Sequence, residues 1–504
     1  MVKLDGNHLT LEEVRSVAHN NELVQVSEAG RSQIVISHQR LEQIIRTGDP
    51  VYGINTGFGI FSDRRIPAED MARLSRNLIL SHSVGTGPAL PGDVVRAAML
   101  VRANTLSKGY SGVRLEVVQT LLDMLNLGVT PVIPSQGSLG SSGDLCPLSH
   151  LALVFTNDEM DREEESGSAE YKGRVLSGKA AMIEAGIARI RLGAKEGLAV
   201  NNGATFSAAL AALIVVEAQH LMNMAEVSLA MSLEAMLGCS AAFDHRLHAV
   251  RGHKGQIQVA KNVLKLVKGS NLVDSGCRIQ DAYSLRCAPQ VQGAARETLA
   301  FVRGVIETEV NAATDNPLIF EPDTAISGGN FHGEPIGMVM DYLGIALSEV
   351  AAISERRTFR LTDAKLNAGL PPMLVDRPED AGLNSGLMMP QYTAASLVLE
   401  NQTLACPDSV HSLPTSAEQE DHNANSMTAA RHTNQILQNT NHVIAIEMYT
   451  AARALDLRLR GRPESRLGQG TGAMHKKIRA MVPYLAGDAY WGPEIQKVKE
   501  LIFF

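Results

Sequence analysis

Residues 208–238 read AALAALIVVEAQHLMNMAEVSLAMSLEAMLG, a run rich in alanine, leucine and methionine. These residue types favour the α-helix, and apolar side chains would occupy most faces of the helix. Such a helix needs burial on nearly all sides, so the stretch predicts the centre of a helical bundle. A subunit interface is the alternative use of the same apolar faces.

The sequence around this stretch also favours long helices. No proline occurs between Pro147 and Pro289, although average usage of about 5% would place roughly seven prolines there. The segment that opens with Pro414-Thr415-Ser416 carries Glu418 and Gln419, the pattern of a capping box at a helix start. Long helices are predicted for Arg296–Ala312, Pro335–Arg357, Leu387–Ala405 and Ser416–Leu459.

The N-terminal part shows a different pattern. The run SQIVIS at Ser32–Ser37 is typical of a β-strand, and Tyr52–Gly59 is rich in turn residues. We therefore expect an all-α fold with a small mixed N-terminal part. The expected division places this part in residues 1–195 and the long-helix bundle with the C-terminal helices in residues 196–504, both within one module.

Composition limits the possible functions. The chain has 504 residues, and 46 lysines and arginines stand against 54 aspartates and glutamates, which gives a formal net charge of −8. The chain has no block of lysines and arginines, so the sequence does not predict a basic surface that would bind nucleic acid or an anionic membrane. The most apolar run, Ala208–Val216, ends at Glu217 and is far shorter than the ~20 residues that span a bilayer. The N-terminus lacks a signal-peptide pattern, so we expect a cytoplasmic protein.

Cysteine and histidine usage predicts neither a disulfide framework nor a metal site. The cysteines are scattered and lack CxxC spacing, which fits free thiols in a reducing compartment. His411, Asp421 and His422 lack a recognisable ligand spacing, so no metal is predicted. The cysteines are Cys146, Cys239, Cys277, Cys287 and Cys406.

The stretch GSLGSSGDLCPLSH at Gly137–His150 is the best candidate for chemistry. It lacks the GK[ST] ending of a P-loop, which disfavours nucleotide binding. A Ser-Ser-Gly tripeptide can condense on itself when the Gly143 amide nitrogen attacks the Ser141 carbonyl carbon and Ser142 loses its hydroxyl. Glycine suits the nucleophile position because no Cβ blocks the compressed turn. The product carries an exocyclic methylidene, an electrophile that no standard side chain supplies.

Further motifs follow along the chain. They are VYGINTGFG (51–59), RNLILSHSVGTG (76–87), GLAVNNGAT (197–205), IQDAYSLRCAPQ (279–290), NAATDNP (311–317), SGGNFHGEP (327–335), GLNSGLMMPQYTAA (382–395) and SLPTSAEQEDH (412–422). In this order, from about Tyr52 to Arg460, the chain resembles the histidine and aromatic amino-acid ammonia-lyases. The chain departs from the family at Ser141, where alanine is usual, and at Ala204, where threonine is usual. The segment HNAN after Asp421 is also longer than the family's usual segment at this place.

The resemblance implies that Ser141, Ser142 and Gly143 form the family's cofactor, 4-methylidene-imidazol-5-one, with no external cofactor. It also implies the all-α fold of the fumarase/aspartase-like superfamily and a homotetramer whose sites draw on several subunits. The substrate would be a small amino acid. The electrophile would capture its amine and make it a better leaving group.

The resemblance also assigns roles to side chains. Tyr52 takes the role of the base, Tyr283 stands beside the cofactor, and Arg286 pairs with the substrate carboxylate. From the residues alone, Tyr52 could instead be a tyrosine packed in a turn, and Arg286 could instead form a structural salt bridge. Positions around the substrate and the cofactor ring are matched by Asn202, Gln280, Phe331 and Met388.

Two residues favour histidine as the substrate. His82 and Glu420 match positions where histidine-specific members place an imidazole partner and a carboxylate. A glutamate accepts a hydrogen bond from an imidazole N–H and would be buried without a partner against a phenyl ring. The alternative for Glu420 is a solvent-facing acid in the first turn of a helix that begins at Ser416.

Because His82 and Glu420 both favour an imidazole ring, we expect deamination of L-histidine to trans-urocanate. The alternatives are a tyrosine or phenylalanine ammonia-lyase, an aromatic aminomutase, or a catalytically inactive helical scaffold.

Overall fold

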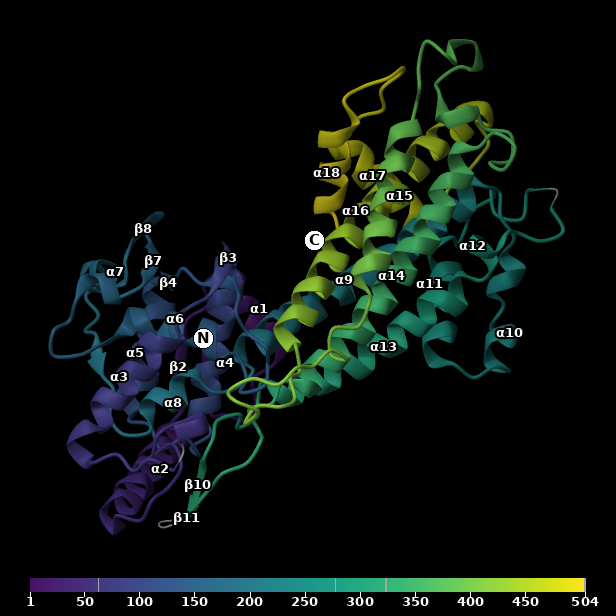
Figure 1. Cartoon of the computed structure of the whole chain (residues 1–504). Coiled ribbons are helices and arrows are strands. Elements are labelled where there is room, and N and C mark those ends of the chain that lie inside the picture. Colours follow the sequence, from purple (N-terminus) through teal and green to yellow (C-terminus); the bar gives the residue numbers. More distant parts are fainter. Residues whose placement is uncertain (62, 277, 322–323, 503–504) are drawn as a thin grey trace. The chain divides into compact units, whose positions relative to one another are not determined.

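The computed structural model describes residues 1–61, 63–276, 278–321 and 324–502. The chain forms two compact units (Figure 1). Because two late segments return to the first unit, its boundaries differ from the division at residue 195 that the sequence suggested. The first unit comprises Met1–Val216, Arg303–Asp341 and Pro407–Arg431, and the second comprises Glu217–Val302, Tyr342–Cys406 and His432–Phe504.

The first unit combines helices with small sheets. Every strand of the described residues belongs to it, which confirms the expected mixed part of an otherwise helical fold. Among these described strands, four two-stranded sheets pair β1 (Val2–Leu4) with β2 (Val24–Val26), β3 (Thr86–Ala89) with β5 (Pro134–Gln136), β6 (Thr156–Asn157) with β9 (Ile190–Arg191), and β10 (Leu318–Glu321) with β11 (Thr324–Ile326). In a three-stranded sheet, the central strand β7 (Ser168–Tyr171) pairs with β4 (Thr130–Pro131) on one side and with β8 (Arg174–Ser177) on the other. The helices before residue 202 are α1 (Leu11–Asn20), α2 (Glu28–Thr47), α3 (Met71–His82), α4 (Gly92–Ser107), α5 (Leu115–Leu127), α6 (Leu145–Phe155), α7 (Gly178–Ala185) and α8 (Glu196–Asn201).

The segment Ser32–Ser37, predicted as a strand, lies inside helix α2. Ser27 caps the start of this helix, and its hydroxyl accepts a hydrogen bond from the Gly30 amide at 3.0 Å. Within the helix Ile34 is buried, whereas the next two apolar side chains are exposed. The strand prediction is therefore wrong, because a cap outside the apolar run determines the local structure.

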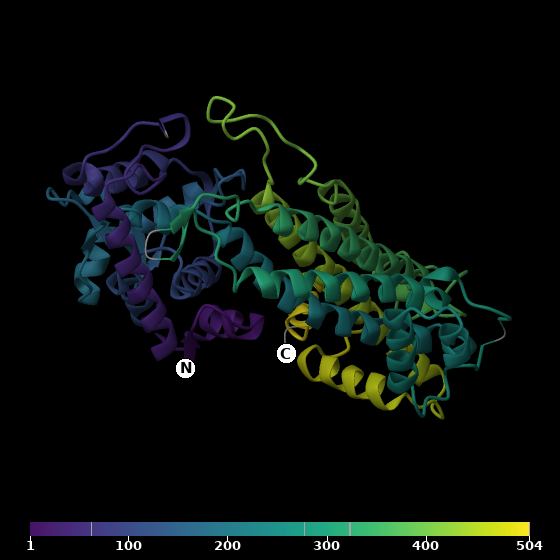
Figure 2. The same cartoon turned by 90° about the horizontal axis from the view of Figure 1, so that it is seen from below.

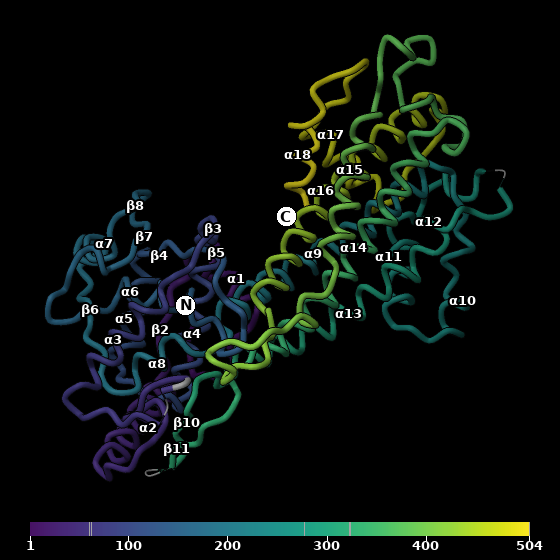
Figure 3. Tube along the Cα trace, viewed as in Figure 1, coloured from purple at the N-terminus to yellow at the C-terminus, as the bar shows by residue number. Residues whose placement is uncertain are grey.

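The second unit is built from helices. Figure 2 shows its long helices, coloured teal to yellow, side by side, and Figure 3 follows their Cα trace. The predicted helices around residues 208–238, 296–312, 335–357 and 387–405 are confirmed. The helices from residue 205 onward, four of which also contribute residues to the first unit, are α9 (Thr205–Ala235), α10 (His245–Ala249), α11 (Lys254–Leu266), α12 (Tyr283–Arg286), α13 (Ala288–Glu309), α14 (Glu334–Thr362), α15 (Met388–Leu404), α16 (Ser426–Gly461), α17 (Gln469–Met481) and α18 (Trp491–Glu500).

Helices α9 and α14 contain apolar stretches long enough to cross a membrane. Most residues of these stretches are buried within the structure. A core helix of a soluble protein has this combination of length, composition and burial. The two helices are therefore core helices, which the composition of residues 208–238 predicts for α9.

Helix α16 begins at Ser426 rather than at residue 416. Residues 416–418 have left-handed backbone conformations, with φ of 51°, 51° and 68°, which a right-handed helix excludes. Backbone hydrogen bonds instead close a loop between Thr415 and Glu420, whose N and O atoms lie 2.7 Å apart. The capping-box prediction is therefore wrong, and Glu420 lies on a loop.

A buried ion pair joins three long helices of the second unit. Arg357 of α14 and Glu447 of α16 have side chains with no solvent exposure, and the guanidinium donates to both carboxylate oxygens at 2.5 and 2.8 Å. The hydroxyls of Ser232 in α9 and Ser354 in α14 donate to the same carboxylate, each at 2.6 Å. Glu447 thus has its acceptors satisfied by both helices that flank it.

We predict that Glu447→Ala lowers the free energy of unfolding by about 3–5 kcal/mol, because it leaves the Arg357 charge buried without a partner. Urea unfolding measures this change. The control is Arg377→Ala, which removes an exposed partner of Asp380 in the same unit and should leave the unfolding midpoint unchanged. Equal midpoints for the two variants would contradict the structural role of the buried pair.

Candidate active site

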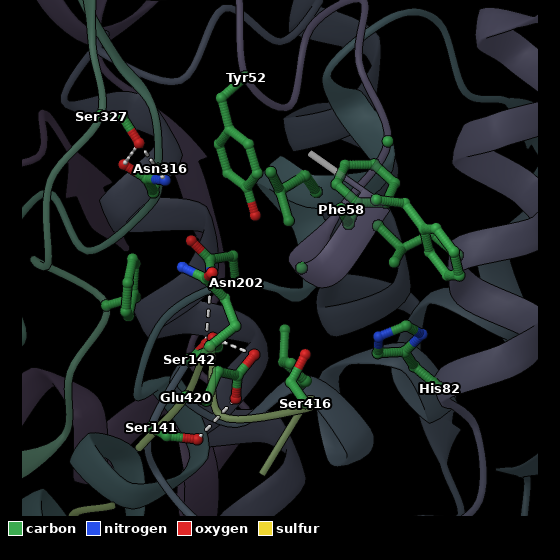
Figure 4. A pocket seen from close by; sticks show the side chains of 18 of the residues that line it. Tyr52, Phe58, His82, Ser141, Ser142, Asn202, Asn316, Ser327, Ser416 and Glu420 are labelled. Carbon is green, nitrogen blue, oxygen red and sulfur yellow. Dashed lines mark hydrogen bonds between the residues drawn. The ribbon is translucent and has the colours of Figure 1, made fainter. Parts of the chain in front are cut away.

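One pocket in the first unit collects most of the predicted site residues (Figure 4). Its volume is about 1340 Å³, whereas pockets for small ligands usually enclose about 300–1,000 Å³. The walls come from the turn after α2, the end of α3, the loop before α6 and the loop before α16. The predicted residues that line it are Tyr52, His82, Ser141, Ser142, Asn202, Phe331 and Glu420.

The third residue of the tripeptide, Gly143, packs directly on the backbone of Gly203. Gly143 has φ of 74°, and a Cβ added there would lie 2.1 Å from the Gly203 carbonyl carbon. Gly203 has φ of 119°, and its added Cβ would lie 2.6 Å from Thr314 Oγ1. Both positions therefore require glycine for two reasons, the left-handed backbone and the close approach.

Two N–H groups converge on the carbonyl oxygen of Ser142. Asn202 Nδ2 donates at 2.9 Å and the Gly203 amide at 3.3 Å. Helix α9 begins at Thr205, directly after these donors, so the positive end of its dipole lies at the same place. The arrangement favours negative charge on the Ser142 oxygen, as an oxyanion hole does.

Asp144 joins this loop to the start of α9. Its carboxylate accepts hydrogen bonds from the Ser207 amide at 2.8 Å, the Ser207 hydroxyl at 2.9 Å and the Ser138 hydroxyl at 2.7 Å. Complete burial raises the pKa of Asp144, and these hydrogen bonds oppose the rise. Sequence reasoning did not single out Asp144, although it directly follows Gly143 in the quoted motif.

Arg102 of helix α4 fixes the backbone on the other side of the loop. Its fully buried guanidinium donates to the Asn202 carbonyl at 2.7 Å and to Thr205 Oγ1 at 2.6 Å. Burial lowers the pKa of Arg102 to about 10, so it stays charged at neutral pH. Arg102 was also missed, and the available signal was the presence of two arginines, Arg96 and Arg102, within a strongly apolar helix.

Glu420 contacts two residues of the tripeptide. Ser141 Oγ donates to Glu420 Oε2 at 3.0 Å, and Ser142 Oγ donates to Glu420 Oε1 at 3.2 Å, as the dashed lines in Figure 4 show. The alternative of an acid in the first turn of a helix is therefore wrong. Its carboxylate faces the pocket instead.

Burial changes the acid–base behaviour of two other pocket residues. It raises the pKa of the Tyr52 phenol, and the Glu420 charge adds to the rise while a backbone hydrogen bond at Gly59 opposes it. It also lowers the pKa of His82, so the imidazole is neutral at pH 7. The Tyr52 hydroxyl is directed towards Asn202 in Figure 4. A phenolate at Tyr52 would therefore need positive charge from elsewhere.

The remaining predicted residues belong to the second unit. Tyr283 and Arg286 lie on one face of the short helix α12, with the guanidinium 4.5 Å from the ring centroid. Tyr283 is 70% exposed, and within the described ranges Arg286 forms no ion pair. Gln280 is exposed before α12, and Met388 is the exposed first residue of α15. The structural salt bridge considered for Arg286 is therefore absent from the described part of the chain.

Two pocket residues outside the predicted set hold each other in place. Asn316 Nδ2 donates to Ser327 Oγ at 3.1 Å, and Asn316 Oδ1 accepts from the Gly328 amide at 2.7 Å. Both side chains appear on the pocket wall in Figure 4. They come from the motifs NAATDNP and SGGNFHGEP, which therefore carried the signal for them.

Thiols and metal ligands are distributed as follows. Cys146, Cys239, Cys287 and Cys406 are free, as predicted, and Cys277 lies outside the described residues. In the part of the chain that the structure describes, no group of three or more histidine, cysteine, aspartate or glutamate side chains is arranged to hold a metal.

Solved structures define the class of protein. A crystal structure of histidine ammonia-lyase from Trypanosoma cruzi matches with a TM-score of 0.90 and 38% identity, and the match covers 100% of this chain and 93% of that one. A crystal structure of tyrosine aminomutase from Streptomyces globisporus matches with a TM-score of 0.92 and 35% identity, covering 99% and 96%. The fold is thus shared by ammonia-lyases and aminomutases.

Sequence comparison then gives the family. A family model described as aromatic amino acid lyase matches residues 9–480. A histidine ammonia-lyase from Caldanaerobacter subterraneus subsp. tengcongensis is 49% identical over 490 residues, which cover 97% of this chain and 93% of that protein. The chain belongs to the aromatic amino acid lyase family, and the resemblance seen in the ordered motifs is confirmed.

The glycine contact yields a stability prediction. In a Ser142→Ala background, in which residues 141–143 stay linear in both variants, Gly143→Ala should unfold at a lower urea concentration than Gly173→Ala. Gly173 has nearly the same φ, 73°, but an added Cβ meets nothing within 4 Å, so the pair isolates the clash from the backbone strain. The clash should cost about 1–3 kcal/mol beyond the control, the usual range for overpacking. Identical unfolding curves would show that the close approach to Gly203 does not constrain the fold.

Proposed function

We propose that this chain is an enzyme of the histidine ammonia-lyase type, a carbon–nitrogen lyase that converts L-histidine to trans-urocanate and ammonia in the cytoplasm. The observation that carries the proposal is the Glu420 carboxylate, which faces the pocket beside Ser142. An acceptor at this place suits an imidazole N–H and would be left without a partner by a phenyl ring. The relatives named histidine ammonia-lyase, which are 43–49% identical over nearly the full chain, support the same substrate.

We propose that Ser141, Ser142 and Gly143 condense into 4-methylidene-imidazol-5-one. The Gly143 nitrogen bonds to the Ser141 carbonyl carbon, and the carbonyl oxygen leaves as water with the amide protons of residues 142 and 143. The Ser142 hydroxyl leaves as a second water with the Cα proton of the same residue. The left-handed Gly143 packed on Gly203 supports this step, because no Cβ separates the reacting atoms.

When formed, this group supplies an electrophilic carbon for the substrate amine. The chain's own contribution is to polarise the Ser142 carbonyl, through the Asn202 and Gly203 donors and the N-terminus of α9. Arg102 and Asp144 keep these donors in place from behind. His82 and Phe331 line the pocket in which the substrate ring would lie.

Tyr52 is proposed to remove the β-proton of the substrate. Burial raises the pKa of the Tyr52 phenol within this chain. To act as a base, Tyr52 therefore needs positive charge nearby, supplied by the residues that complete the site. Arg286 carries such a charge, and its planar guanidinium also suits the substrate carboxylate.

We propose a homotetramer in which Gln280, Tyr283, Arg286 and Met388 complete the site of another subunit. Two observations support sharing. The pocket of about 1340 Å³ is larger than an amino acid needs, and Tyr283 and Met388 are 70% and 39% exposed. A second chain could therefore bring its Tyr283 and Arg286 side chains to this pocket.

The choice of histidine is tested with Glu420→Gln. Loss of the charged acceptor should lower kcat/KM for histidine by roughly 10- to 100-fold, the range for a hydrogen bond to a charged group, as measured by urocanate absorbance. Glu418→Gln removes the same charge from an exposed side chain of the same loop and should behave as the wild type. Formation of cinnamate, coumarate or a β-amino acid with no urocanate by the wild type would contradict the proposal.

Sharing of sites is tested by mixing two inactive variants. Ser142→Ala removes the cofactor precursor, and Arg286→Leu removes the carboxylate partner. If the two residues of one site come from different chains, co-expressed variants form some sites with both native residues and regain activity. Recovery no greater than that of the separate variants, together with a monomer in light scattering, would show that each site belongs to one chain.

A further inference from the structure

The two serines that hold Glu420 meet different fates if the tripeptide condenses. Ser142 loses its hydroxyl as water when its Cβ–Oγ bond breaks and its Cα proton departs, which leaves a Cα–Cβ double bond. Ser141 gives up only its carbonyl oxygen. Its side chain takes no part in the condensation and keeps its hydroxyl.

The two serine hydroxyls donate to different oxygens of the Glu420 carboxylate, so the loss of one hydroxyl changes only one of these oxygens. Before condensation, Ser142 Oγ occupies Glu420 Oε1 at 3.2 Å, and Ser141 Oγ occupies Oε2 at 3.0 Å. Loss of the Ser142 hydroxyl removes the donor at Oε1. Ser141 is a buried residue, with 8% of its surface exposed, and the condensation leaves its hydroxyl as a donor to Oε2.

We infer that Ser141 is a positioning residue for substrate recognition, in which its hydroxyl holds Glu420 Oε2 so that the vacated Oε1 accepts the N–H of the substrate imidazole. The inference rests on the proposed function and deepens it. Condensation of the tripeptide then prepares two features at once, the electrophile and a free carboxylate oxygen for the ring. An alanine at position 141 builds the same cofactor without this hydrogen bond.

The physical gain is orientation of the carboxylate. Glu420 lies on a loop that is closed by backbone hydrogen bonds between Thr415 and Glu420, but its side chain has rotatable bonds of its own. A donor fixed at one oxygen restricts these rotations before the ligand arrives, so less freedom is lost on binding. A carboxylate with one satisfied oxygen also pays less for burial than one with none.

The test measures binding without chemistry. In a Ser142→Ala background, which lacks the cofactor and leaves Oε1 free, Ser141→Ala is compared with Ser141→Thr by calorimetric titration of two ligands. We expect Ser141→Ala to weaken trans-urocanate by about tenfold, the scale of a hydrogen bond to a charged group, and to leave cinnamate binding unchanged. Ser141→Thr keeps a hydroxyl and should bind urocanate like the parent.

Two further measurements separate positioning from general packing. When Glu420→Gln is already present, Ser141→Ala should cause no further loss of urocanate affinity, because the two residues act through one hydrogen bond. With Ser142 intact, Ser141→Ala should still lose two waters by intact mass. Its KM for histidine should rise with little change in kcat, as for lost uniform binding.

The inference would be overturned if Ser141→Ala bound urocanate as tightly as its parent, or if the substitution weakened urocanate and cinnamate equally. The proposed function would still stand in that case if the wild type converted histidine to urocanate. The inference and the proposed function would both be overturned if the wild type formed no urocanate from histidine and the Ser142→Ala parent bound cinnamate but not urocanate.

Discussion

The close approach of two glycine backbones is the constraint on which this site depends. Gly143 and Gly203 pair through their main chains, and a Cβ on either would meet backbone or side-chain atoms well inside van der Waals contact. Their contact brings the Ser142 carbonyl oxygen to the Asn202 side chain and the Gly203 amide. The fold thus prepares a compressed turn and a polarised carbonyl before any bond changes.

Buried charges keep this geometry in place. Arg102 reaches the Asn202 carbonyl from helix α4, and Asp144 binds the first turn of α9 through Ser207. Each charged group is completely buried, so it is stable there only because its hydrogen-bond partners replace water. The second unit uses the same principle, since Arg357 and Glu447 join its long helices. Rigid helices therefore present the loop, while the loops supply the reacting groups.

The sequence predicted the features that depend on local composition or on ordered motifs. The helix at residues 208–238 and the pocket position of Glu420 are examples. It failed at Ser32–Ser37, where the cap at Ser27 outweighs an apolar run, and at residues 416–418, whose left-handed backbone follows from the loop closed at Glu420. Arg102 and Asp144 were missed because their partners are distant in the chain, and composition does not reveal such pairs.

The central claim is that residues 141–143 do not remain a linear peptide in the folded protein. Peptide mapping of the freshly purified wild type by mass spectrometry tests it most directly. The account predicts that the fragment containing Ser141-Ser142-Gly143 is lighter than its sequence requires by the mass of two waters. A fragment of unmodified mass from correctly folded protein would contradict it.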